Sequence, residues 1–186
     1  MGIFDLLKKF AAPAVKEAAK ALSTQTESFS FSALPKSVEE LKALPEASLD
    51  TPFKTAALTV CALCAYVDSP EVGKEMLNFL KGPQPLSTRE IQFMNDRFRE
   101  GKYVPVSFFA GAKPENDYTP DKPFRITVST NPYSFQEENY AMLWMTSGGA
   151  DSPRSVKLRK KGDQWFLWEQ FLLSGIRKAK SEDPWA

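Results

Sequence analysis

The fold is decided by residues 52–67, which read PFKTAALTVCALCAYV. The last twelve of these residues are uncharged, and only Thr59 among them is clearly polar. A helix that is apolar on every side has no face to offer to water, so the pattern predicts a helix at the centre of the core. Asp50 or Thr51 can cap its first turn, where Pro52 also fits. The run is too short to cross a bilayer, which needs about 20 apolar residues.

The composition is that of one ordinary globular domain. The chain has 186 residues, of which 42% are hydrophobic and 25% charged, and domains commonly span about 100–200 residues. Its 24 basic and 23 acidic side chains leave a net charge of +1, whereas a nucleic-acid-binding domain usually carries a basic excess on one face. We therefore predict one domain over residues 29–186 and do not expect a nucleic-acid partner.

The sequence contains no histidine and only two cysteines. The absence of imidazole excludes serine and cysteine triads that use a histidine base, and it excludes zinc sites with imidazole ligands. Two thiols are also too few for a four-thiolate zinc site within one chain. We therefore expect no metal, no other cofactor and no catalytic activity.

Residues 1–28 form a segment of their own, an amphipathic helix followed by a polar linker. Apolar residues recur at helical spacing from Ile3 to Phe10 within residues 3–22, and STQTES follows at residues 23–28. We expect the helix to dock on the domain or on a partner chain. The alternative is an anchor at a membrane surface, because a basic amphipathic helix can lie in the interface. The segment lacks the basic start and long apolar run of a signal peptide, and we predict a cytoplasmic protein.

Capping residues mark three further helices. In a capping box, a serine hydroxyl accepts a hydrogen bond from the backbone N–H three residues later. The glutamate side chain at that later position accepts a hydrogen bond from the backbone N–H of the serine. Ser37 and Ser87 each begin this pattern. A third helix begins at Pro70 and stops before Gly82. The predicted helices cover residues 36–44, 70–81 and 88–100.

The second half of the chain alternates between apolar and polar residues, which is typical of half-buried strands. Residues 103–110 predict an extended segment at a sheet edge, because Pro105 cannot donate to a neighbouring strand. Gly162 and Asp163 predict a tight hairpin. The other predicted strands cover residues 29–33, 124–129, 139–146, 154–160 and 164–169. We thus predict an α+β fold in which N-terminal helices pack on a C-terminal antiparallel β-meander of about four strands.

Cys61 and Cys64 have the CxxC spacing, which places both sulfurs on one face of a helix. A redox pair needs its first cysteine at a helix N-terminus, where the helix dipole lowers the pKa of the thiol. Cys61 lies in the interior of the predicted helix among apolar neighbours, which raise that pKa. We interpret the pair as core residues. The alternatives are a redox pair and a metal site shared between subunits.

Four basic residues between positions 157 and 161 lie next to two tryptophans. Basic residues interleaved with aromatic ones can bind single-stranded nucleic acid, but charged and apolar residues also alternate in any half-exposed strand. Arg154, Lys157 and Arg159 are the candidates for an anion site. A local ion pair between Arg154 and Asp151 is the alternative.

The hairpin RSVKLRKKGDQWFLWE and the tail SEDPWA resemble the C-terminal part of an uncharacterised bacterial family of proteins with no assigned function. This resemblance implies no activity. The order of helices before a curled sheet, with charged-Gly-Asp-x-Trp in the last hairpin, is also similar to nuclear-transport-factor-2-like domains. Enzymes of that superfamily commonly use histidine and aspartate inside the cone of the fold, whereas this chain has no histidine.

The last predicted strand, QWFLWE, is apolar on both faces, so both faces need cover. With no catalytic group singled out, we predict a non-catalytic protein that binds a protein partner or itself. The predicted interaction residues are Trp165, Trp168, Trp185 and Phe10. The alternative is a small-molecule pocket of nuclear-transport-factor-2-like type, with or without hydrolase or isomerase activity. The predicted pocket residues are Phe108, Tyr140, Trp144, Trp168 and Glu169.

Overall fold

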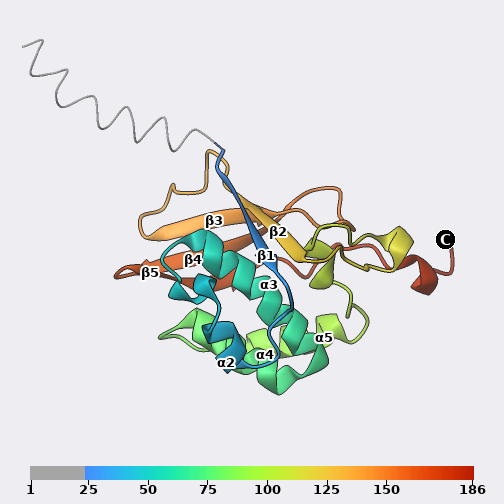
Figure 1. Cartoon of the computed structure of the whole chain (residues 1–186), viewed down its shortest axis with the longest axis horizontal. Helices are drawn as coiled ribbons and strands as arrows, with labels where there is room; N and C mark the ends of the chain where they lie inside the picture. The colour runs from blue at the N-terminus through green and yellow to red at the C-terminus, as the bar shows by residue number, and fades with distance from the viewer. Residues whose placement is uncertain (1–23) are drawn as a thin grey trace, which may run out of the picture.

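An antiparallel sheet and a layer of helices make up residues 24–186, the part of the chain that the computed structural model describes (Figure 1). Helices α2 to α5 lie together on one side of the sheet, and the C-terminus lies at the far end of the long axis from the start of β5. The amphipathic helix predicted over residues 3–22, with Phe10, lies outside the described residues.

The sheet has five strands in the order β1-β2-β3-β4-β5, and every neighbouring pair is antiparallel. The strands are β1 Thr26–Phe31, β2 Phe124–Ser129, β3 Tyr140–Met145, β4 Arg154–Lys161 and β5 Gln164–Gln170. The predicted α+β meander is confirmed, but it has one strand more than the predicted four. The additional strand is β1, which corresponds to the strand predicted over residues 29–33; it precedes the helices and joins the meander by pairing with β2 in the register Phe29 to Ile126. It begins at Thr26, so residues 26–28 of the predicted linker belong to the sheet.

Helix α3 is the centre of the core, as the sequence predicts. The helices are α2 Val38–Lys42, α3 Pro52–Asp68, α4 Pro70–Lys81 and α5 Thr88–Phe98. Thirteen of the 17 residues of α3 are buried, and α3 contacts all five strands. Thr51 is the residue that caps α3, because its hydroxyl accepts from the N–H of Lys54 at 3.3 Å. Within the core, the hydroxyl of Thr59 donates to the carbonyl of Thr55 at 2.8 Å, so its polar group is satisfied.

Helix α4 packs so closely on α3 that one contact position has no room for a side chain. A Cβ built on Gly73 would lie 2.3 Å from the Cα of Tyr66. Carbon atoms in contact lie about 3.5–4.0 Å apart, so only glycine permits this approach. Helix α4 ends at Lys81.

The extended segment predicted over residues 103–110 is wrong. The chain there forms turns and a short 3-10 helix, Val106–Phe108, with Pro105 in helical backbone conformation. The N–H of Ser107 donates to the carbonyl of Tyr103, and the N–H of Phe109 donates to the carbonyl of Val106. A short apolar run predicts burial more firmly than it predicts conformation, and here it is buried as turns.

In residues 24–186, no helix is long and apolar enough to cross a membrane.

Candidate functional site

The candidate site is a cavity of about 650 Å³ beside the edge strand β5, which we call the β5 cavity. One wall is the turn between α4 and α5, with two prolines, and the other wall comes from β4 and β5. Its lining residues are Lys81, Pro83, Gln84, Pro85, Ser87, Glu90, Arg159, Lys160, Lys161, Phe166, Leu167, Trp168 and Glu169. The site thus joins the helical half of the chain to the last hairpin.

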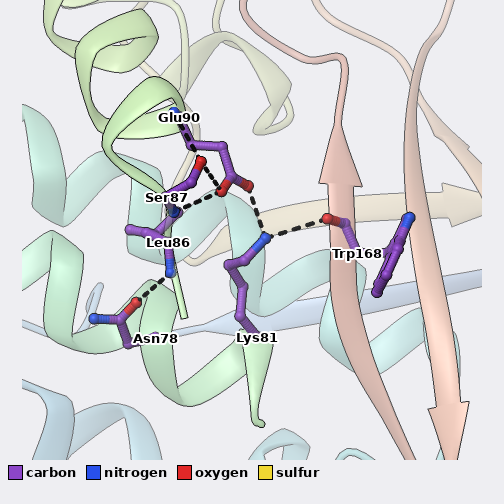
Figure 2. A network of polar contacts seen from close by, with 6 residues as sticks. All are labelled: Asn78, Lys81, Leu86, Ser87, Glu90 and Trp168. Atoms are coloured by element: carbon purple, nitrogen blue, oxygen red, sulfur yellow. Dashed lines mark hydrogen bonds and ion pairs between the residues drawn. The ribbon is translucent and has the colours of Figure 1, made fainter. Parts of the chain in front are cut away.

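An ion pair on the helical wall is joined to the strand wall by a hydrogen bond (Figure 2). The ammonium of Lys81 lies 2.7 Å from Oε1 of Glu90 and donates to the backbone carbonyl of Trp168 at 3.2 Å. Only 6% of the Lys81 side chain is exposed, against 39% for Glu90. The indole of Trp168 lies on the side of β5 away from Lys81. The pair therefore ties α4, α5 and β5 together at the cavity.

The two carboxylate oxygens of Glu90 have different partners. While Oε1 accepts from Lys81, Oε2 accepts from the backbone N–H of Ser87 at 2.8 Å and from its hydroxyl at 2.7 Å. The Ser87 hydroxyl in turn accepts from the N–H of Glu90, which completes the predicted capping box. Burial raises the pKa of Glu90, but the hydrogen bonds from Lys81 and Ser87 lower it more, so the net shift is downward. Glu90 is therefore a carboxylate at neutral pH.

The last three residues of β4 are cations that line the cavity, and we call them its cationic rim: Arg159, Lys160 and Lys161. All three are exposed, and no ion pair to them is found within residues 24–186. The guanidinium of Arg159 lies over the rings of Trp168, at 4.8 Å, and Tyr140, at 5.4 Å. Such contacts hold a cation in place without neutralising its charge.

The ring of Phe166 forms part of the cavity wall, and the turn after α4 packs directly against this ring. Gly82 has a φ of 63°, and a Cβ on it would lie 2.4 Å from the ring of Phe166. Glycine is therefore required there both for the backbone conformation and for the contact. The arrangement leaves the ring of Phe166 half-buried against the core.

A second cavity, of about 410 Å³, continues along β5 from the first. The two share Glu90, Leu167 and Glu169 in their linings. Phe93 and Phe171 line the second cavity and are 39% and 45% exposed. Together the cavities form a groove that follows β5 from Phe166 to Phe171, about 17 Å at about 3.3 Å per residue.

The predicted interaction residues differ in how far their own chain covers them. Trp165 is half-buried against the core, and its backbone N–H donates to the backbone carbonyl of Leu49 at 2.7 Å. Trp168 is half-buried and lines the β5 cavity. Trp185 is 94% exposed. Phe10 lies outside the described residues.

The predicted pocket residues do not converge. Glu169 and Trp168 line the β5 cavity, and Tyr140 packs edge-on against Trp168 with ring centroids 5.7 Å apart. Phe108 lies in the core, and Trp144 lies half-buried on β3. Neither Phe108 nor Trp144 lines either of the two cavities described above.

The predicted anion-site residues also separate. Arg154 donates to the backbone carbonyls of Ser152, Ser174 and Gly175. The ion pair considered between Arg154 and Asp151 is not formed, because Asp151 pairs with Arg177 at 2.6 Å.

The other two anion-site residues lie on β4. The ammonium of Lys157 lies 2.6 Å from a carboxylate oxygen of Glu137. Arg159 alone of the three lines the cavity.

Both cysteines are free and lie in α3, where Cys61 is buried and Cys64 partly exposed. Burial raises the pKa of both thiols, and the carboxylate of Asp68 raises that of Cys64 further. A thiol with a raised pKa is a poor nucleophile at neutral pH. Within residues 24–186, no cluster of three or more acidic or thiol ligands could hold a metal ion.

Sequence reasoning missed the helical wall of the cavity, above all Lys81. A signal was present, because Lys81 follows Leu77 by four residues and so lies on the apolar stripe of α4. A lysine on a buried stripe needs a partner of opposite charge, and here the partner is Glu90 of the next helix, α5.

One family model, described as a domain of unknown function (DUF6935), matches residues 33–180. The match agrees with the resemblance to an uncharacterised family that the last hairpin and the tail indicate. No curated protein and no solved structure matches the chain. The comparisons therefore give no support to the likeness to nuclear-transport-factor-2-like domains.

Proposed function

The chain belongs to the family of the DUF6935 domain of unknown function, and we propose that it is a non-catalytic protein that binds an acidic segment of a partner protein. The segment lies in the β5 cavity, with its carboxylates at the cationic rim and an apolar side chain between Phe166 and the two prolines. The observation that carries this proposal is the cationic rim itself.

The charge of the cavity supports an acidic ligand. Its lining holds four cations and two carboxylates, and one of those cations, Lys81, is already paired with Glu90. The rim cations Arg159, Lys160 and Lys161 are left to attract a ligand. Exposed charges of one sign around a cleft raise both the rate and the selectivity of association with the opposite charge.

The shape of the groove supports an extended chain. The two cavities follow β5 for about 17 Å, which is the reach of about five extended residues. Aromatic side chains are common anchors at protein interfaces because they bury a large area at a small cost in conformational entropy. Proline residues at positions 83 and 85 keep the opposite wall stiff.

A non-catalytic role follows from the ionisable groups in the cavity. The lowered pKa of Glu90 suits an ion pair and not a general acid or base near neutral pH. The sequence offers no histidine to take that role.

A small organic anion is the second candidate ligand. A volume of about 650 Å³ lies in the range of small-molecule sites, about 300–1,000 Å³. An aromatic carboxylate would use the same rim and the same rings. The continuation of the groove into the second cavity favours the peptide.

Selection from a random peptide library displayed on phage tests the proposal. We expect enrichment of peptides that combine two or more acidic residues with an aromatic or large apolar one. Their binding should fall at least tenfold in the variant Arg159→Glu/Lys161→Glu. The control variant Lys36→Glu/Lys102→Glu changes two exposed lysines elsewhere and should bind as the unaltered chain does. Enrichment without an acidic preference, or equal binding by the rim variant, would overturn the proposal.

A further inference from the structure

The C-terminal residues 181–186, SEDPWA, which we call the tail, carry the most exposed large apolar side chain of the described residues. Trp185 is 94% exposed. Tryptophan is enriched among the residues that contribute most to binding at protein interfaces.

The tail is held in a defined shape. The side chain of Asp183 accepts from the backbone N–H of Trp185 at 2.9 Å, which is the hydrogen bond of an Asx turn. The N–H of Ser181 donates to the carboxylate of Asp117, which fixes the start of the tail to the body of the protein. A segment that is already ordered loses less conformational entropy when it binds.

The chemistry of the tail matches the β5 cavity. Its two ionisable side chains, Glu182 and Asp183, are acidic and lie next to Trp185. The cavity offers the three cations of its rim beside the rings of Phe166 and Trp168. An acidic segment with one aromatic anchor is the ligand that the proposed function requires.

The tail cannot fill the cavity of its own chain. Figure 1 shows the C-terminus at one end of the long axis and β5, whose residues 166–169 line the cavity, towards the other end. The hydrogen bond from Ser181 to Asp117 keeps the tail at that distant end. Contact between the two therefore needs two molecules.

We infer that the partner of the β5 cavity is a second copy of this chain, whose tail enters it with Trp185 as the anchor. This inference rests on the proposed function and names its partner. The contact is heterologous, since different surfaces of the two copies meet, so it forms rings or open chains of molecules. A six-residue tail buries less than the roughly 1,200 Å² of a stable interface, and the association is weak and dependent on concentration.

Sedimentation velocity of the full chain over a range of concentrations tests the inference. We expect the weight-average mass to rise with concentration, and we expect Trp185→Ala to weaken the association at least tenfold. Tyr133→Ala is the matched control, because Tyr133 is also an aromatic residue and is 66% exposed. The control should associate as the unaltered chain does.

Charge reversal makes the test specific to the two surfaces. Each of the variants Arg159→Glu/Lys161→Glu and Glu182→Lys/Asp183→Asn should stay monomeric by itself, and asparagine keeps the acceptor of the Asx turn. A mixture of the two should associate, because the rim variant keeps an unaltered tail and the tail variant keeps an unaltered cavity that can bind it. Association of the separate variants, or no association of their mixture, would overturn the inference.

The failure of this inference can be told from failure of the proposed function. If the unaltered chain stays monomeric at every concentration while acidic phage peptides still bind to the cationic rim, the partner is a different protein and only the inference is overturned. If the peptides do not bind either, both are overturned.

Discussion

Replacing Glu90 by glutamine should destabilise the protein although the two side chains are almost identical in shape. In the native protein, Oε1 accepts from the buried ammonium of Lys81 and Oε2 accepts from Ser87. A glutamine has only one oxygen, and its NH₂ group must then face either the ammonium or the N–H of Ser87. One donor loses its acceptor in both orientations.

The size of the destabilisation depends on which donor is left without an acceptor. An unsatisfied buried polar group costs about 1–3 kcal/mol, and the 39% exposure of the Glu90 side chain lets water recover part of this. We therefore expect Glu90→Gln to lower the free energy of unfolding by about 1–2 kcal/mol. Lys81→Met should cost less, about 0–1 kcal/mol, because it removes a buried charge and leaves a carboxylate that water can reach.

Urea unfolding at neutral pH, followed by tryptophan fluorescence, measures both variants. The double variant Lys81→Met/Glu90→Gln should cost less than the sum of the single ones, with a coupling of about 1 kcal/mol. If Lys81→Met cost as much as Glu90→Gln, or if Glu90→Gln cost less than about 0.5 kcal/mol, the assignment of Lys81 as the buried member of the pair would be wrong.

The same pair gives a pH dependence with a defined sign. The pKa of Glu90 is lower in the folded protein than its unfolded value of about 4.3. Its ionisation therefore stabilises the fold above the unfolded pKa, and this contribution is lost as the pH falls through the folded pKa. The stability difference between the unaltered chain and Glu90→Gln should be constant near neutral pH and shrink below about pH 4. A difference that grew on acidification would contradict the lowered pKa.

Two further predictions concern the core. Gly73→Ala should destabilise the protein by about 1–3 kcal/mol or more, because its Cβ would lie 2.3 Å from the backbone of Tyr66, whereas the exposed control Glu75→Ala should change the urea midpoint little. Cys61 should react with a chromogenic disulfide reagent at neutral pH only on unfolding, and Cys64 slowly, since burial raises the pKa of both thiols. Fast reaction of both thiols in the folded chain would instead indicate a redox pair.

Local signals predicted the helices and the last strands of this fold well. Thr51 and Pro52 begin α3 as expected, and Ser87 with Glu90 begins α5. The alternation of residues 124–129 gave the limits of β2. These features depend on neighbours a few residues apart, which is the range over which capping and periodicity act.

Long-range partners could not be predicted in the same way. Strand β1 pairs with a strand almost a hundred residues later, and nothing in its six polar and aromatic residues specifies that partner. Residues 103–110 were misassigned because an apolar run is compatible with a strand and with buried turns. The basic residues and tryptophans of the last hairpin were recognised as a group. The cavity beside them was not, since its other wall comes from the end of α4 and the turn after it.

The central claim is that the β5 cavity binds an acidic segment with an aromatic anchor, which we infer to be the tail, and chemical-shift mapping with the tail peptide tests it most directly. The isotope-labelled Trp185→Ala chain, titrated with the synthetic peptide SEDPWA, should show shifts at the indole of Trp168 and at the amides of residues 159–161. The peptide SEDPAA should give no such shifts. Shifts absent from these residues, or equal shifts with both peptides, would contradict the account.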